Sequence, residues 1–184
     1  LPTEPVPGGI GLIGQSLERP RMLEQDAPTF ERPLALLRAC HGRVERFADL
    51  AARIPDHLAG DGTPDEAAIR AAGRVLRYFD QAAPLHHADE EADLLPRLRA
   101  RLPATETETP AVLAGLAAEH EGLEAHWRAL RPHLERLAQG RAVPPETLRP
   151  AAEAFRDAQL DHLSRENARI LPAAEAHLTP ADWA

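Results

Sequence analysis

Apolar residues recur at every third or fourth position along four long stretches of the chain. This spacing places them on one side of an α-helix and predicts helices over residues 33–54, 65–101, 110–139 and 145–177. Pro55 and Gly140 end the first and third of these helices, and Pro84 predicts a kink within the second. Because the connections between them are short, the pattern favours an all-α fold, an up-down antiparallel four-helix bundle.

The chain divides by composition into three parts. Residues 1–30 are rich in proline and glycine and show no apolar period, which predicts an irregular N-terminal arm. Residues 31–178 contain the predicted bundle, and residues 179–184 form a C-terminal tail. A chain of 184 residues is long enough for one domain with a substantial core.

Histidines interrupt the apolar stripes of the predicted helices. His41 lies on the stripe of the first helix, and His162 on that of the fourth, with Glu166 four residues later. Residues at positions i and i+4 lie one turn apart on the same helix face, close enough to bind one ion together. In the third helix His120 is the one polar member of a stripe whose other positions are apolar: Leu113, Leu116, Leu123, Trp127, Leu130, Leu134 and Leu137.

The second helix offers two pairs with the same spacing. The stretch "HHADEE" places His86 four residues before Glu90, and His87 four residues before Glu91. Stepping back from Leu98 by α-helical turns, the apolar stripe reaches Glu91 and then His87. The pattern therefore predicts that His87 and Glu91 face the bundle axis, while His86 and Glu90 face solvent.

Carboxylates among leucines require a compensating positive charge. The predicted inward carboxylates are Glu91, Glu166 and, at the edge of its stripe, Glu124, which follows His120 by four residues. Left uncompensated, three such groups would exceed the roughly 5–15 kcal/mol net stability of a typical domain. No arginine falls on the stripes at this level, so a metal centre is the simplest remaining explanation.

The donor set indicates the kind of metal centre. It contains imidazoles and carboxylates but no thiolate, and it offers more donors than the four that one zinc ion takes. Such a set suits two ions joined by bridging carboxylates. Carboxylate-bridged di-iron inside a four-helix bundle is the best-known arrangement of this kind, with di-manganese as the alternative.

Charge and composition exclude several function classes. The formal net charge of -8 argues against a nucleic-acid partner, because phosphate-backbone binders show a concentrated basic face. The single cysteine, Cys40, excludes an internal disulfide and a CxxC site. No apolar run approaches the roughly 20 residues that span a bilayer, and no secretory signal pattern opens the chain. We therefore expect a cytoplasmic protein without a membrane partner.

At these positions the sequence resembles the hemerythrin-like family, also called HHE cation-binding domains, in its carboxylate-substituted bacterial branch. The resemblance covers most of residues 33–175 and rests on "RACHGRVERF", "HADEEADLLP", "EHEGLE" and "HLSRENARILP". It implies two iron ions with an oxo or hydroxo bridge, or manganese or zinc in their place, and it implies that Glu91 and Glu166 bridge the ions. The ligands it implies are His41, His87, Glu91, His120, Glu124, His162 and Glu166.

The third helix departs from the oxygen-carrying members of that family. Those members have HxxxH at this place, whereas here Glu124 stands where the second histidine would be. His126, two residues further on, is the alternative ligand. Since an anionic ligand stabilises ferric iron, the resemblance implies oxidation of bound iron by O2 or peroxide rather than reversible oxygen carriage.

The function expected is that of a non-haem di-iron protein that senses, binds or reacts with O2, peroxide or a related small molecule. If the chain is an enzyme, the resemblance implies an iron-dependent redox activity, either peroxide breakdown or a ferroxidase-like reaction. The alternative is a helical interaction or structural module with a structural or vestigial metal site. The metal, the signalling partner and the formation of a homo-oligomer stay open at this point.

Overall fold

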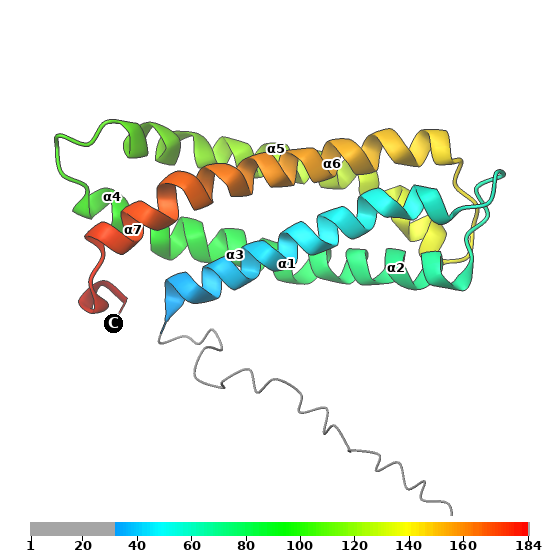
Figure 1. Cartoon of the computed structure of the whole chain (residues 1–184), viewed down its shortest axis with the longest axis horizontal. Helices are drawn as coiled ribbons and strands as arrows, with labels where there is room; N and C mark the ends of the chain where they lie inside the picture. Colours follow the sequence, from blue (N-terminus) through cyan, green and yellow to red (C-terminus); the bar gives the residue numbers. More distant parts are fainter. Residues whose placement is uncertain (1–31, 184) are drawn as a thin grey trace, which may run out of the picture.

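The computed structural model describes residues 32–183, and these residues form four helical rods connected by short loops (Figure 1). No strand occurs within them; the extended residues Leu58 and Pro64 make an isolated bridge. The all-α four-helix bundle is therefore confirmed. The predicted arm, residues 1–30, lies outside the described residues. The helices are α1 (Pro33–Arg53), α2 (Glu66–Arg77), α3 (Ala83–Asp89), α4 (Leu95–Arg101), α5 (Glu108–Ala138), α6 (Pro145–Arg165) and α7 (Leu171–His177).

Two of the four rods are single helices, and two are composite. Helices α1 and α5 each form one rod, while α2, α3 and α4 follow one another along the second rod, and α6 and α7 along the fourth. Helix α5 packs along both α2 and α6, and α6 also packs along α1. Short 3-10 helices, Ile54–His57 and Pro180–Trp183, follow the first and last rods. No helix among residues 32–183 combines the length and hydropathy needed to cross a membrane.

Wide helical turns join the parts of the composite rods. Three π-helical segments, Tyr78–Ala82, Glu90–Leu94 and Glu166–Ile170, each end two residues before a proline: Pro84, Pro96 and Pro172 respectively. A proline has no N–H to donate to the carbonyl four residues earlier, and its ring collides with that carbonyl. The residue before each proline instead donates its N–H five residues back, as Leu95 does to Glu90. Each wide turn therefore contains one residue more than the α-helical turn that the apolar spacing assumes.

The buried apolar side chains form two clusters, one toward each end of the bundle. One cluster contains Phe79, Leu134 and Phe155, and the other contains Leu98 and Leu116. Between the two clusters each rod carries buried polar residues. On α1, for example, His41 lies between Leu37, which packs on the second cluster, and Val44, which belongs to the first. The fold thus places a polar layer across the middle of an otherwise apolar interior.

The loop before α2 requires a glycine at position 62. Gly62 has φ +80°, and a Cβ atom there would lie 2.2 Å from the carbonyl oxygen of Val143. We expect Gly62→Ala to destabilise the fold by about 2 kcal/mol or more, because it combines a left-handed backbone with a collision against main chain. Thermal unfolding of the purified variant measures the loss. Gly60→Ala is the matched control, since nothing lies within 4 Å of its new Cβ, and equal melting temperatures for the two variants would contradict this account.

Candidate metal centre

Six ionisable side chains from all four rods meet in the polar layer. Each is at most 7% exposed, and together they comprise His41, His86, Glu90, His120, His162 and Glu166. Helix α1 supplies the first, the second rod the next two, α5 the fourth, and the fourth rod the last two. Because the two apolar clusters close the layer from both ends, these groups are removed from bulk water.

The carboxylate of Glu90 lies between histidines of different rods. Its Oε1 atom is 3.4 Å from His41 Nε2 and 3.3 Å from His86 Nε2. Its Oε2 atom is 3.7 Å from His120 Nε2. Each oxygen therefore faces a different part of the layer, as the oxygens of a bridging carboxylate do.

Glu166 occupies a comparable position on the fourth rod. Its Oε2 atom lies 3.3 Å from His41 Nε2 and 3.4 Å from His162 Nε2. Within residues 32–183, the ion pairs of both carboxylates are with histidines and not with arginine. The two carboxylates thus lie between His41 on one side and the histidines of α5 and α6 on the other.

Three histidines are oriented from behind by hydrogen bonds from Nδ1. His41 Nδ1 donates to the side-chain oxygen of Asn167 at 2.8 Å, and His120 Nδ1 donates to Glu91 at 2.6 Å. His162 Nδ1 donates to Glu119 at 3.0 Å. In the tautomer that carries its proton on Nδ1, the lone pair lies on Nε2, the atom that faces Glu90 or Glu166. Carboxylate or amide partners on the far nitrogen are the usual support for metal-ligating histidines.

The layer is short of hydrogen-bond donors. Of the buried side-chain atoms without a hydrogen-bond partner in the described part of the chain, all but one belong to this layer. They are His86 Nδ1 and Nε2, Glu90 Oε2, His120 Nε2, His162 Nε2, and Glu166 Oε1 and Oε2. Each orphaned buried polar atom costs on the order of 1–3 kcal/mol. Nearly all of these atoms are acceptors turned toward one another, so a cation among them would satisfy the layer.

Burial also sets the protonation of the layer in the absence of a cation. Desolvation raises the pKa of Glu90 to about 8, and that of Glu166 likewise to about 8. Desolvation, followed by the neighbouring histidines, lowers the pKa of His86 to about 2. Without a metal, these shifts favour a neutral imidazole at His86 and protonated carboxyl groups at Glu90 and Glu166. Neutral imidazole with carboxylate is the donor combination that divalent metal ions bind, and donor atoms of His41, His86, Glu90 and Glu166 all lie within 4.8 Å of one another.

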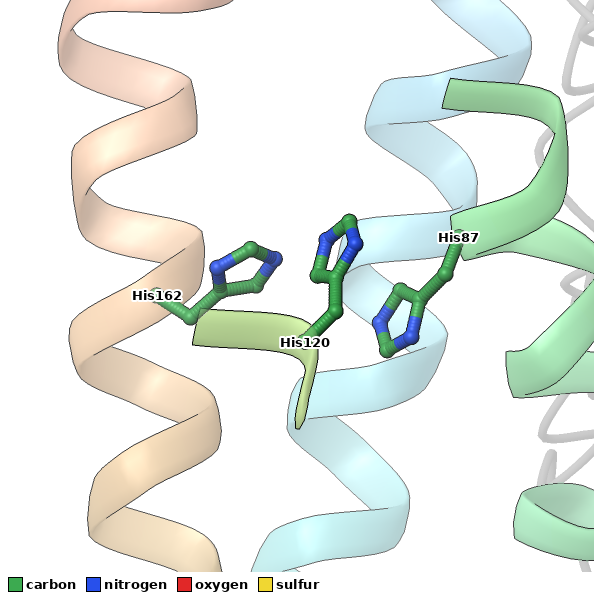
Figure 2. A group of neighbouring side chains, drawn as sticks. All are labelled: His87, His120 and His162. Carbon is green, nitrogen blue, oxygen red and sulfur yellow. The ribbon is translucent and has the colours of Figure 1, made fainter. Parts of the chain in front are cut away.

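A second set of donors includes a half-buried histidine. Ring nitrogens of His87, His120 and His162 lie within 4.8 Å of one another, and Figure 2 shows the three rings turned toward a common space. Donor atoms of Glu90, His120, His162 and Glu166 also lie within 4.8 Å of one another. His120 and His162 therefore take part in two overlapping groups, while Glu90 and Glu166 are shared between the two halves of the layer.

The prediction that His87 and Glu91 form the inward pair is wrong in the second rod. His86 and Glu90 are buried, whereas the Glu91 side chain is 49% exposed and contacts the layer only through Nδ1 of His120. Three α-helical turns back from Leu98 end at His87, but the π-turn over Glu90–Leu94 inserts one residue, so the inward face passes through Glu90 and His86. His87 still reaches the edge of the layer, beside His120.

Glu124, the predicted extra ligand of the third helix, lies away from the layer. The Glu124 side chain is 65% exposed, and its nearest charged partner is Arg128, at 4.0 Å. The alternative, His126, is exposed as well. Of the predicted ligands, the structure brings His41, His120, His162 and Glu166 together inside, with His87 beside them. It leaves Glu91 and Glu124 outside. Whether any of these residues binds a metal stays a prediction.

A signal for the correct pair was present in the sequence. The stretches "HHADEEADLLP" and "HLSRENARILP" have the same length and end alike, so that aligning their prolines places His86 over His162 and Glu90 over Glu166. Both stretches contain the same π-turn before the proline. Comparison of the two composite rods, rather than the apolar stripe alone, would have identified His86 and Glu90.

The raised pKa values predict how the stability of the metal-free protein depends on pH. Glu90 and Glu166 hold their protons more tightly in the folded state, so the stability they contribute is present below their ordinary pKa of 4.5 and is lost as pH rises through about 8. His86 and His162, whose pKa values are lowered by burial, act in the opposite sense, below their ordinary pKa of 6.5. Between pH 6.5 and about 8, denaturant unfolding with a chelator present should therefore show falling stability. The Glu90→Gln/Glu166→Gln double variant should flatten this slope; an unchanged slope would contradict the account.

Comparison with known proteins agrees with this arrangement. Residues 32–174 match the family described as the hemerythrin HHE cation binding domain. A protein of Haemophilus influenzae described as an uncharacterized protein is 38% identical over 113 residues, which are 61% of this chain and 63% of that protein. The match thus spans less than two thirds of that relative's length. No solved structure matches the chain. Since the family match covers most of the sequence, this chain belongs to the hemerythrin HHE cation-binding domain family.

Proposed function

We propose that the chain is a non-haem di-iron protein that binds or reacts with O2, peroxide or a related small molecule. The observation that carries the proposal is the buried layer in which Glu90 and Glu166 face the Nε2 atoms of four histidines, with no arginine paired to either carboxylate among residues 32–183. A single ion would leave part of this donor set unused. Two ions would use both carboxylates as bridges.

The donors divide into two halves that share the carboxylates. His41 and His86 would hold one ion, and His120 and His162 the other, with Glu90 and Glu166 between them. Two iron ions in this nitrogen and oxygen set would supply the one-electron oxidation steps that reactions of O2 and peroxide require. Asn167, Glu91 and Glu119 would keep the ring nitrogens aimed inward and make the imidazoles more basic ligands.

A cleft between α3 and α5 leads toward the layer from outside. Its walls include the apolar side chains of Phe79, Leu123 and Trp127, the carboxylates of Asp80, Glu91, Glu121 and Glu124, and the imidazoles of His87 and His120. Apolar walls flanked by carboxylates favour small neutral molecules over anions, which suits O2 and hydrogen peroxide.

Gln159 is a buried amide in the wall of this cleft. It is 3% exposed and lies on α6 one turn before His162. Its side-chain oxygen is buried and has no hydrogen-bond partner among the described residues. A protonated oxygen of a small molecule in the cleft would supply the missing donor.

The site assignment predicts which acidic residues are needed for metal binding. Loading with ferrous iron without oxygen, followed by elemental analysis, should give about two ions per chain in the native protein. Glu90→Gln should lose most of this iron, because the substitution removes a bridging carboxylate. Glu91→Gln should weaken iron binding about 10- to 100-fold, because it removes only the carboxylate that orients His120. Glu124→Gln, on the exposed face of α5, should bind iron as the native protein does.

Two outcomes would contradict the proposal. One is loss of iron in Glu124→Gln with full iron in Glu90→Gln. The other is a native protein that binds no iron and whose melting temperature does not change when iron is added. The second outcome would favour a helical interaction module with a vestigial site.

Because the side-chain oxygen of Gln159 has no hydrogen-bond partner among the described residues, we expect its removal to raise stability and to lower reactivity. Gln159→Leu should raise the melting temperature of the metal-free protein, because it removes a buried acceptor that costs about 1–3 kcal/mol. The same change should slow oxidation of the ferrous protein by hydrogen peroxide several-fold, measured by stopped-flow absorbance. An unchanged oxidation rate would show that Gln159 does not contact the small molecule.

A further inference from the structure

A groove on the outside of the bundle is lined by arginines. It has a volume of about 700 Å³ and lies where α1 runs between α2 and α6 (Figure 1). None of its lining residues belongs to the polar layer. The arginines of this arginine groove are Arg43, Arg46 and Arg53 of α1, Arg74 of α2 and Arg156 of α6. The groove is therefore basic, although the chain as a whole has a formal net charge of -8.

The protein leaves most of this positive charge without a carboxylate partner. Elsewhere in the bundle arginines commonly pair with acidic residues, as Arg131 does with Asp80 at 2.9 Å. In the arginine groove Arg156 pairs with its neighbour Asp157 at 2.7 Å. The other four arginines make no ion pair with any carboxylate among residues 32–183. A concentration of uncompensated charge of one sign attracts a molecule that carries the opposite sign.

The guanidinium groups also keep most of their hydrogen-bond donors available. Arg43 donates to the sulfur of Cys40 at 3.2 Å, and Arg46 donates through Nε to the carbonyl oxygen of Gly42 at 3.0 Å. The side chain of Arg53 makes no hydrogen bond with the described residues. Because each guanidinium carries several N–H donors in a planar fork, the groove can bind several carboxylate groups at once.

The arginine groove also contains two apolar side chains and one carboxylate. Phe47 and Leu50 line it and pack against the apolar core beneath. The Phe47 ring stacks on Tyr78 at 4.3 Å, and the guanidinium of Arg74 lies over it at 5.8 Å. Asp49 makes no hydrogen bond or ion pair with the described residues, so its oxygens can accept from N–H donors of a bound molecule.

These features favour a polypeptide over other anions. A phosphate chain has neither an apolar part for Phe47 and Leu50 nor an N–H donor for Asp49. The Phe47 ring already contacts Tyr78 and Arg74, which leaves it little room to stack on a nucleobase. An acidic peptide instead supplies carboxylates, apolar side chains and backbone N–H groups together.

The length of the groove also suits a short peptide. Arg43 and Arg53 are ten residues apart on α1, which corresponds to about 15 Å along a helix. An extended peptide of about five residues covers this distance.

We propose that the arginine groove is the docking surface for an acidic segment of a partner protein, in which aspartate or glutamate alternates with apolar residues. This inference goes beyond the proposed function and does not rest on it, because none of the lining residues is a candidate metal ligand. The competing explanation is that the arginines are solvated and bind no partner.

Fluorescence anisotropy with a labelled peptide tests the proposal. The probe is a synthetic peptide of about ten residues in which glutamate and leucine alternate, long enough to cover the groove. The native protein should bind it saturably, and Arg46→Glu/Arg53→Glu should bind it at least about 10-fold more weakly, because it reverses two of the charges that face the peptide. Replacing the leucines of the peptide by serine should weaken binding several-fold, because it leaves Phe47 and Leu50 without apolar contacts.

The matched control is Arg99→Glu/Arg141→Glu. It changes the net charge by the same amount at two exposed positions outside the groove, and it should keep the native affinity. All four substituted arginines are exposed, so both double variants should fold, which circular dichroism checks before the titration.

Four outcomes would overturn the proposal. The first is the absence of saturable binding to the native protein, and the second is an equal loss of affinity in the two double variants, which would indicate attraction by net charge alone. The third is equal affinity for the leucine and serine peptides. The fourth is displacement of the peptide by inorganic tripolyphosphate or ATP at a lower concentration than by the unlabelled peptide, which would indicate a site for small phosphorylated anions.

Discussion

The main physical constraint on this structure is the burial of two carboxylates at the centre of a helical bundle. Glu90 and Glu166 are each 1% exposed, and the Nε2 atoms of His86 and His162 lie 3.3 Å and 3.4 Å from their oxygens. In the absence of a metal the layer can avoid buried charge by keeping protons on the carboxyl groups. In the proposed metal-bound form, the same atoms would be the ligands. The apolar clusters on either side contain none of the six ionisable side chains of the layer.

The supporting hydrogen bonds show how the rods cooperate. Asn167, Glu91 and Glu119 each hold a histidine that belongs to another rod. Glu119 also accepts from Arg165, so the support of His162 extends to the surface of the molecule. Because each ring is oriented by a different rod from its own, the geometry of the layer is a property of the assembled bundle and not of any single helix.

The sequence predicts most of this structure where the helices are regular. Helix α5 follows an uninterrupted α-helical period, and the inward position of His120 was correctly predicted from its leucines. His41 and His162 were found by the same reasoning. The prediction went wrong at His87 and Glu91, because a period of 3.6 residues does not hold through a π-turn. The supporting residues were not predictable, because their contacts depend on how neighbouring rods are rotated. Asn167 and His41, for example, are 126 positions apart.

The doubled letters of "HHADEE" acquire a meaning once the wide turn before Pro96 is known. His86 with Glu90 and His87 with Glu91 are two histidine–glutamate pairs of the same i,i+4 spacing, offset by one residue. If the extra residue were absorbed elsewhere in the rod, the second copy would rotate into the place of the first, and an imidazole and a carboxylate would still point inward. The sequence of this rod therefore offers a histidine–glutamate pair to the interior in either of two helical registers.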